Sequence, residues 1–241
     1  MNIRTLRSPL IKAHDSLYAL LDMCVPTLQE QEILVITSKI ISLTEGQVVA
    51  QKDVPSKKDL VQEQADAYLP LNAFSLTIKN HLLIPAAGID ESNGEDIYIL
   101  YPQDVQKSAK EIWNYLRNRD QKKEIGVLIT DSRTSPLRAG VTGVSLGWCG
   151  FKALHNYIGT LDCFGRPLVV TQTNVVDALA AAAVFCMGEG NEQTPFALIS
   201  QAPKVQFSEQ SPSSKELENF YLSFEEDLYA SLFHESWVFK K

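Results

Sequence analysis

The sequence GVLITDSRTSPLRAGVTGVSLGWCG, residues 126–150, joins a short apolar run to a polar, glycine-rich segment. The apolar residues 127–129 predict a buried strand that ends at the polar residues 130–132, where a carboxylate and a hydroxyl enter a loop. Two guanidinium groups, Arg133 and Arg138, follow them. This pattern indicates a ligand site at a strand end, although a turn closed by an Asx-type hydrogen bond has the same composition.

The composition describes a folded protein without an excess of positive charge. The chain has 241 residues, of which 45% are hydrophobic, and this supplies enough apolar material for a sizeable core. The formal net charge is -7, whereas nucleic acids and anionic membranes attract proteins through positive charge. We therefore expect neither a nucleic-acid partner nor a membrane partner, and any anionic ligand must be held by local groups.

The cysteines and the apolar segments indicate a cytoplasmic protein. The four cysteines form no CxxC pair and no cluster with histidine, which favours reduced structural thiols over a zinc site. The N-terminus has no apolar signal core. The longest apolar run, residues 175–187, is interrupted by Asp177 and is too short to span a bilayer.

Apolar periodicity predicts helices and strands along the whole chain. Helices are predicted after Asp15 or Ser16, over 55–66, from Asp104, over 175–187 with Gly188 as its C-cap, and in a C-terminal segment carrying Leu217, Phe220, Tyr221, Phe224 and Leu228. A buried strand is predicted over 33–37, further strands over 168–171 and 196–199, and a hairpin over 75–84. Neither a repeat nor a linker is apparent. We therefore expect an α+β fold of mixed sheets with packed helices, in which residues 1–241 form a single domain of two intimately packed lobes.

Three acidic segments carry the groups best suited to bind a cation. Asp90, Asp131 and Glu189 each follow the end of a predicted strand or helix. Carboxylate oxygens without histidine or cysteine favour Mg²⁺ or Mn²⁺ over zinc, and Ser132 adds a hydroxyl. A metal of this kind usually accompanies phosphate.

The glycine-rich loop 188–195 has a composition that can cradle phosphates through its backbone N–H groups, but the same composition is common in a connection between a helix and a strand. Neither GxxxxGK[ST] nor GxGxxG after a strand is present. The residues alone therefore leave open both a metal–phosphate enzyme and a globular domain without that chemistry.

Five short motifs follow one another along nearly the whole chain: PLI (9–11), TSKIISLTEG (37–46), AGIDESN (87–93), GVLITDS (126–132) and MGEGN (187–191). In this order they resemble the coenzyme F-420-0:L-glutamate ligase family, whose members extend a deazaflavin coenzyme with γ-linked glutamates. The longer segments ITDSRTSPLRAGVTGV (129–144) and MGEGNEQTP (187–195) are most similar to the bacterial branch described as folate-metabolism γ-glutamate ligases.

The resemblance implies a ligase that uses GTP and Mg²⁺ or Mn²⁺ to phosphorylate a terminal carboxylate, after which the α-amine of L-glutamate displaces the phosphate. ATP in place of GTP stays open, as does the choice between a folate-type and a deazaflavin acceptor. The family fold also implies an α+β protein and an intertwined homodimer with active sites near the subunit interface.

Site residues carry over motif by motif. The implied metal ligands are Asp90, Asp131, Ser132 and Glu189. The implied nucleotide contacts are Ser8, Pro9, Leu10, Ile11, Ser38, Lys39, Asn93, Met187, Gly188, Gly190, Asn191, Glu192, Gln193 and Thr194.

Two arginines and one leucine modify this assignment. We assign Arg133 and Arg138 to catalysis together with Asp131, because rigid cationic forks suit a transferred phosphate or a substrate carboxylate; surface salt bridges are the alternative. Leu43 stands where many deazaflavin ligases have a lysine, and Lys39 is the candidate substitute. Two other functions stay compatible with the residues: a nucleotide-binding protein without catalysis, and a metal-dependent phosphohydrolase that uses the same acids on water.

Overall fold

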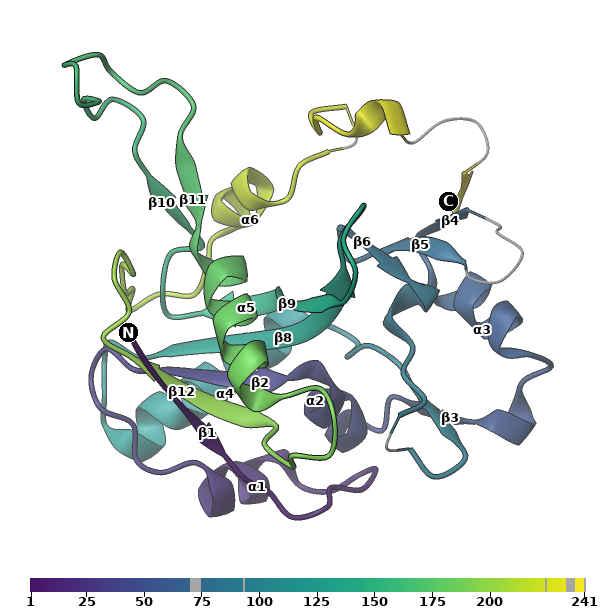
Figure 1. The fold of residues 1–241 in the computed structure, drawn as a ribbon. Coiled ribbons are helices and arrows are strands. Elements are labelled where there is room, and N and C mark those ends of the chain that lie inside the picture. Colours follow the sequence, from purple (N-terminus) through teal and green to yellow (C-terminus); the bar gives the residue numbers. More distant parts are fainter. Residues whose placement is uncertain (70–74, 93, 224, 233–236, 241) are drawn as a thin grey trace.

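A computed structural model describes residues 1–69, 75–92, 94–223, 225–232 and 237–240 (Figure 1). In this part of the chain a five-stranded mixed sheet has the strand order β1-β12-β2-β8-β9. Its members are β1 (Asn2–Leu6), β12 (Phe196–Ser200), β2 (Ile33–Thr37), β8 (Gly126–Thr134) and β9 (Val141–Cys149). Strands β2 and β8 are parallel, and the other neighbours are antiparallel. The expected α+β class with mixed sheets is confirmed.

Both faces of this central sheet are buried, which explains why β2 is apolar without interruption. Ile33 and Val35 enter the core beneath one helix, whereas Leu34 and Ile36 enter the core on the opposite face. Helix α5 (Val175–Met187) covers the first face. The helices of the second face are α1 (Leu17–Cys24), α2 (Ser38–Glu45) and α4 (Val105–Asp120).

A second lobe lies beside the β8–β9 end of the central sheet (Figure 1). Its sheet has the order β13-β4-β5-β6, and a separate ladder pairs β3 with β7. The bounds are β3 (Val48–Ala50), η1 (Gln51–Asp53), α3 (Lys57–Gln64), β4 (Ala67–Leu69), β5 (Leu76–Lys79), β6 (Leu82–Pro85), η2 (Ala86–Gly88), β7 (Ile97–Ile99) and β13 (Val238–Phe239). Ile84 and Tyr101 of this lobe belong to the core of the first lobe, so the two parts share apolar contacts.

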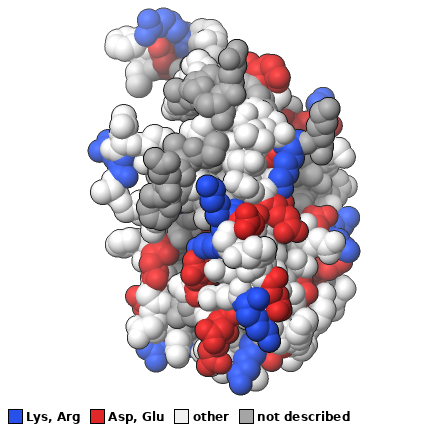
Figure 2. Space-filling view, turned by 90° about the vertical axis from the view of Figure 1, so that its right-hand side faces the viewer, with Lys and Arg blue, Asp and Glu red and all other residues white. Residues whose placement is uncertain are grey.

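The C-terminal segment connects the two lobes. Helix α6 (Ser214–Phe220) packs near Trp148 of the central sheet, η3 (Ala230–Leu232) follows it, and β13 then pairs with β4. On the side of the molecule that carries the second lobe, Lys and Arg are interspersed with Asp and Glu and form no extended positive surface (Figure 2). None of the helices in the described residues is sufficiently long and apolar to cross a membrane.

Several sequence predictions are confirmed. The strand over 33–37 and the helix over 175–187 with its Gly188 cap have the expected bounds, and β12 and the hairpin formed by β5 and β6 are present. Asp104 caps α4, and Ser16, rather than Asp15, caps α1. The charged helix predicted over 55–66 is the shorter α3.

The prediction that the strand after residue 126 ends at residues 130–132 was wrong. Strand β8 continues to Thr134 because β9 pairs with it along its whole length. Ile129 pairs with Gly147 and Thr130 with Ser145, so Leu146 is the additional residue of a β-bulge.

Two further elements differ from the prediction. Residues 168–171 are not a strand: they belong to an arm, residues 154–174, that projects from the body between β10 (Leu154–Asn156) and β11 (Gln172–Asn174) (Figure 1). Val169 and Val170 are exposed there because no other element covers them. The C-terminal helix ends at Phe220, Leu228 is exposed beyond it, and Phe224 lies outside the described residues.

Gly143 sets the distance between α5 and the sheet, and replacing it tests this packing. A Cβ at Gly143 would lie 2.4 Å from the carbonyl oxygen of Ala180 and 2.7 Å from Cβ of Val184. We predict that Gly143→Ala lowers the free energy of unfolding by about 1–3 kcal/mol through overpacking. Urea denaturation measures this, with the exposed neighbour as control: Thr142→Ala should change stability by less than about 0.5 kcal/mol. Equal effects of the two variants would contradict the assignment.

Candidate active site

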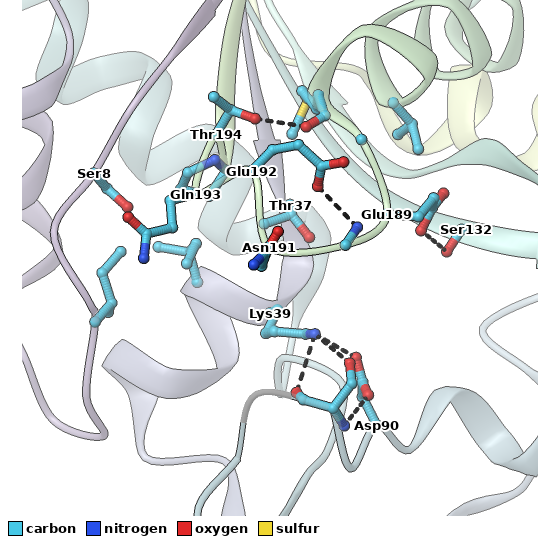
Figure 3. Close-up of a pocket in the computed structure, with 18 of the residues that line it drawn as sticks. Ser8, Thr37, Lys39, Asp90, Ser132, Glu189, Asn191, Glu192, Gln193 and Thr194 are labelled. Atoms are coloured by element: carbon cyan, nitrogen blue, oxygen red, sulfur yellow. Dashed lines mark hydrogen bonds and ion pairs between the residues drawn. The ribbon is translucent and has the colours of Figure 1, made fainter.

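Four segments at one edge of the central sheet, together with one loop of the second lobe, surround a cavity of about 270 Å³ (Figure 3). All predicted metal ligands line it, and so do all predicted nucleotide contacts except Ser38 and Asn93. Ser38 is buried at the first position of α2, and Asn93 lies outside the described residues. The further lining residues, which were not assigned to the site from the sequence, are Thr37, Ile40, Leu43, Ser92, Thr130, Val184 and Pro195.

A larger cavity of about 680 Å³ lies between the β5–β6 hairpin, the start of α4 and the segment after α6. It contains none of the predicted site residues. The smaller cavity is therefore the candidate active site, because it collects residues that are far apart in the sequence and carry the relevant chemistry.

Backbone hydrogen bonds fix the loop 188–195 against the end of the central sheet. Ser8 N–H donates to Gln193 O at 3.1 Å, and Thr37 N–H donates to Pro195 O at 3.1 Å. Thr37 is also the N-cap residue of α2, and its side chain makes no capping hydrogen bond. The loop and the N-terminal end of α2, whose unpaired N–H groups favour anions, therefore border the same cavity.

The side chain of Glu192 stabilises the conformation of the loop 188–195. Its carboxylate accepts a hydrogen bond from Gly190 N–H at 2.8 Å and lies against Gly188, where a Cβ would come within 2.4 Å of Glu192 Cδ. Gly188 has φ +85°, which also disfavours a side chain. Thr194 Oγ1 donates to Met187 O at 2.5 Å and closes the base of the loop. The glycines thus allow the conformation of the loop and leave room for the Glu192 carboxylate.

Asp131 points from β8 toward the second lobe. Its Oδ2 accepts a hydrogen bond from Tyr101 Oη at 2.6 Å. Burial raises the pKa of the Asp131 carboxyl to about 6, and the hydrogen bond from Tyr101 opposes this rise. The same burial, together with the neighbouring carboxylate, raises the pKa of Tyr101 well above its ordinary value, so Tyr101 stays protonated and donates.

Asp90 is held by a cation from the first lobe. Lys39 Nζ lies 2.5 Å from Asp90 Oδ2 and also donates to Ser92 Oγ at 3.0 Å (Figure 3). Burial favours the neutral acid, but the hydrogen bond and charge of Lys39 outweigh it, so the pKa of Asp90 lies below its ordinary value. The backbone of Asp90 is bridged to Ile99 of β7 by two hydrogen bonds, of 3.0 and 2.8 Å. The second lobe thereby presents Asp90 from a fixed position.

The remaining predicted metal ligands meet on the opposite face of β8. Ser132 Oγ donates to Glu189 Oε2 at 3.2 Å. Within the described residues, no three acidic, histidine or cysteine side chains are close enough together to hold one ion. The four predicted ligands therefore share the cavity wall, and each carboxylate has its own partner: Lys39 for Asp90, Tyr101 for Asp131 and Ser132 for Glu189.

Arg133 and Arg138 do not line the cavity. Arg138 is exposed beyond the end of β8, whereas Nε of Arg133 is buried without a hydrogen-bond partner among the described residues. Neither guanidinium makes an ion pair with a carboxylate in that part of the chain, so the alternative of surface salt bridges is not observed there either. Their catalytic role stays a prediction.

Leu43 and Tyr101 illustrate the limits of sequence motifs. Leu43, at the position where many deazaflavin ligases have a lysine, is 6% exposed and is an apolar lining residue of the cavity. Lys39 also lines the cavity. Tyr101 was missed because no motif surrounds it; the only sequence signal is its place two residues after a short strand and before Pro102.

The chain is an α+β protein whose acidic cavity is bordered by loops of two lobes. The model of the family described as F420-0:Gamma-glutamyl ligase matches residues 5–201, a range that includes every residue lining the cavity. The chain belongs to this F420-0:gamma-glutamyl ligase family, as the order of its motifs indicated.

Curated relatives agree with this assignment over most of their length. A protein of Methanosarcina barkeri named coenzyme F420:L-glutamate ligase is 32% identical over 209 residues, which cover 79% of this chain and 81% of the relative. A protein of the same name from Methanococcus maripaludis is 29% identical over 222 residues, covering 84% and 89%. The chain is also similar to the Methanopyrus kandleri protein of that name, at 29% identity over 187 residues.

The buried Asp131 carboxylate should cost stability in metal-free buffer. Because its folded-state pKa of about 6 exceeds the ordinary value of 3.8, folding favours the protonated acid, and stability falls as the pH rises from about 4 to about 6. We predict that Asp131→Asn, with EDTA present, raises the free energy of unfolding at pH 7 by up to about 3 kcal/mol and changes it little at pH 4. Denaturation at both pH values measures this. A destabilised variant at pH 7 would contradict the prediction.

Proposed function

We propose that this protein is a ligase that joins L-glutamate to a carboxylate-terminated acceptor, with GTP as the phosphate donor and Mg²⁺ or Mn²⁺ as the cation. The observation that carries the proposal is the convergence of Asp90, Asp131, Ser132 and Glu189 on one cavity that the loop 188–195 and the start of α2 also border. Membership of the family supports ligation over other uses of the same groups.

The chemistry requires an activated acyl group, since a carboxylate is a poor electrophile toward an amine. In the proposed reaction the γ-phosphoryl group of GTP moves to the acceptor carboxylate and gives an acyl phosphate and GDP. The α-amine of glutamate then attacks the acyl carbon, the C–N bond forms, and inorganic phosphate leaves with the electrons of the C–O bond. This sequence needs groups that hold phosphates and neutralise their charge.

Two features of the cavity suit the nucleotide phosphates. The start of α2 presents N–H groups that no side chain caps, and this end of a helix favours anions. Lys39, the second residue of α2, adds a full positive charge beside them. We therefore assign the phosphates to this end of the cavity.

The donor atoms of the site fit a hard divalent cation in kind. Asp90, Asp131 and Glu189 offer carboxylate oxygens and Ser132 a hydroxyl, which Mg²⁺ and Mn²⁺ prefer. When bound, such an ion neutralises the charge that gathers on the transferred phosphoryl group. Lys39 would then leave Asp90 for the phosphates, because the ammonium group and the divalent ion would compete for the same carboxylate oxygens. In that position Lys39 would supply the cation that the family resemblance implies at position 43.

Two kinds of acceptor are compatible with the proposed reaction. The similar proteins of three methanogens are named for coenzyme F420, which favours a deazaflavin acceptor. The motifs of residues 129–144 and 187–195 favour a folate-type acceptor instead. Both end in a carboxylate that the proposed reaction can activate, so a direct competition between them decides the question.

Product formation tests the ligase. We expect purified protein with L-glutamate, GTP and Mn²⁺ to add one glutamyl residue to tetrahydrofolate or to the deazaflavin acceptor, measured by mass spectrometry with both acceptors present, and to release GDP and phosphate. Asp131→Asn and Glu189→Gln should each lower turnover by about 100-fold or more. Asp22→Asn, which changes a carboxylate at the surface of α1, is the matched control and should retain activity.

Each negative result of this experiment has a defined meaning. Nucleotide hydrolysis that is independent of glutamate and acceptor would replace the ligase by a phosphohydrolase. GTP binding in calorimetry without turnover on any acceptor would leave a nucleotide-binding protein. Equal loss of activity in Asp22→Asn would show that the substitutions act through folding.

We also propose the homodimer of the family, with the arm of residues 154–174 as part of its interface. Apolar side chains along the arm are exposed, namely Ile158, Leu161, Phe164, Val169 and Val170. An exposed apolar set of this kind on one projecting element is typical of a protein–protein contact.

Light scattering tests the arm. We expect the protein to be a dimer at micromolar concentration, and Phe164→Ser with Val170→Ser to shift it to monomer, because both substitutions remove apolar area from the contact. Met23→Ser removes an equally exposed apolar side chain from α1 and should leave the dimer intact. A monomeric parent protein, or an unchanged dimer in the double variant, would contradict this interface.

A further inference from the structure

Tyr101 is held rigidly between the two lobes. It is 7% exposed and lies two residues after the end of β7. The residues on both sides of it are anchored: Leu100 N–H donates to Gln47 O at 3.0 Å, and Gln103 N–H donates to Glu45 Oε2 at 3.1 Å. Pro102 comes next, and a residue before proline is restricted to extended backbone conformations. The phenol ring consequently has little freedom to follow a partner that moves.

The ring contacts the turn that leads to Asp90. Gly88 has φ +71°, and a Cβ there would lie 2.3 Å from the ring of Tyr101. Two residues later the backbone of Asp90 pairs with Ile99, which is itself two residues before Tyr101. One side chain therefore packs on the support of Asp90 while its hydroxyl donates to Asp131 at 2.6 Å.

We propose that Tyr101 is a positioning residue that sets the orientation of the Asp131 carboxylate and its separation from Asp90. The inference rests on the proposed function, in which both carboxylates bind the divalent cation. The hydroxyl occupies Oδ2 of Asp131 and thereby restrains the rotation of a carboxylate that lines the cavity. Hydrogen bonds to ligand groups from outside the coordination sphere orient the ligands in this way, and losing one typically costs 10–100-fold in metal affinity or activity.

The same chain contains a matched pair without that role. Tyr115 Oη donates to Asp22 Oδ1 at 2.7 Å, nearly the same distance, at the exposed contact of α4 with α1, where Arg119 also lies 3.5 Å from Asp22 Oδ1. Neither residue lines the candidate active site. Tyr115→Phe therefore removes an equivalent hydroxyl and hydrogen bond from a place where only packing and stability depend on it.

The experiment compares Tyr101→Phe and Tyr115→Phe in the full-length protein. Mn²⁺ binding is measured by calorimetry without acceptor or glutamate, and turnover is measured separately. We expect Tyr101→Phe to weaken Mn²⁺ affinity by about 10-fold and to lower kcat by a similar factor, with KM for glutamate unchanged. Tyr115→Phe should match the parent protein in all three. Equal Mn²⁺ affinity in the two variants would overturn the inference.

A stability cycle separates positioning from general damage. Urea denaturation of Tyr101→Phe, Asp131→Asn and the double variant should show that Tyr101→Phe has a smaller effect when Asp131 is already replaced, since the two act through one contact. Additive effects would overturn the inference. A parent protein that binds Mn²⁺ but forms no product would contradict only the proposed ligase, whereas one that binds no Mn²⁺ would overturn the role of Tyr101.

Discussion

The parallel pairing of β2 with β8 is the constraint on which the rest of the site depends. Thr37 lies opposite Thr130, so both strands reach the same edge of the sheet together. Strand β12 runs antiparallel to β2 and begins at that edge, and β1 runs antiparallel to β12 and ends there. The pairing of the strands therefore gathers the segments that follow or precede these four strand ends, and hydrogen bonds of Ser8 to Gln193 and of Thr37 to Pro195 hold them there. These segments are residues 8–11, the start of α2, the second half of β8 and the loop 188–195.

Strand β8 is long enough to carry site residues on both of its faces. Successive side chains of a strand point to opposite faces. Asp131 shares the face of Ile129 and reaches Tyr101 and the second lobe, whereas Ser132 shares the face of α5 and reaches Glu189. A strand that stopped at Thr130, as the sequence suggested, would have left these residues on a loop with no fixed division between the two faces.

Local patterns predicted the strand ends because the responsible signals are local. The apolar residues of β2 and α5 fix their bounds, and the polar groups after them stand out by contrast. The extension of β8 was hidden, since Arg133 and Thr134 are polar and become a strand only through pairing with β9. Tyr101 was hidden for the same reason: its significance lies in a partner thirty residues away. Val169 and Val170 have strand-forming side chains, but the fold gives them no face to cover.

The partners of the three carboxylates suggest how the site reconciles folding with cation binding. A buried carboxylate is costly when unpaired, and each acid here has a partner from another segment. These interactions differ in strength. Lys39 makes an ion pair with Asp90, whereas Tyr101 donates an uncharged hydrogen bond to Asp131. Ser132 donates a similar hydrogen bond to Glu189 at the surface. Asp131, whose pKa is raised by burial, is therefore the acid with most to gain from a cation. In the proposed reaction a bound cation would stabilise its ionised form beyond what Tyr101 provides, which would couple assembly of the site to arrival of the metal and nucleotide.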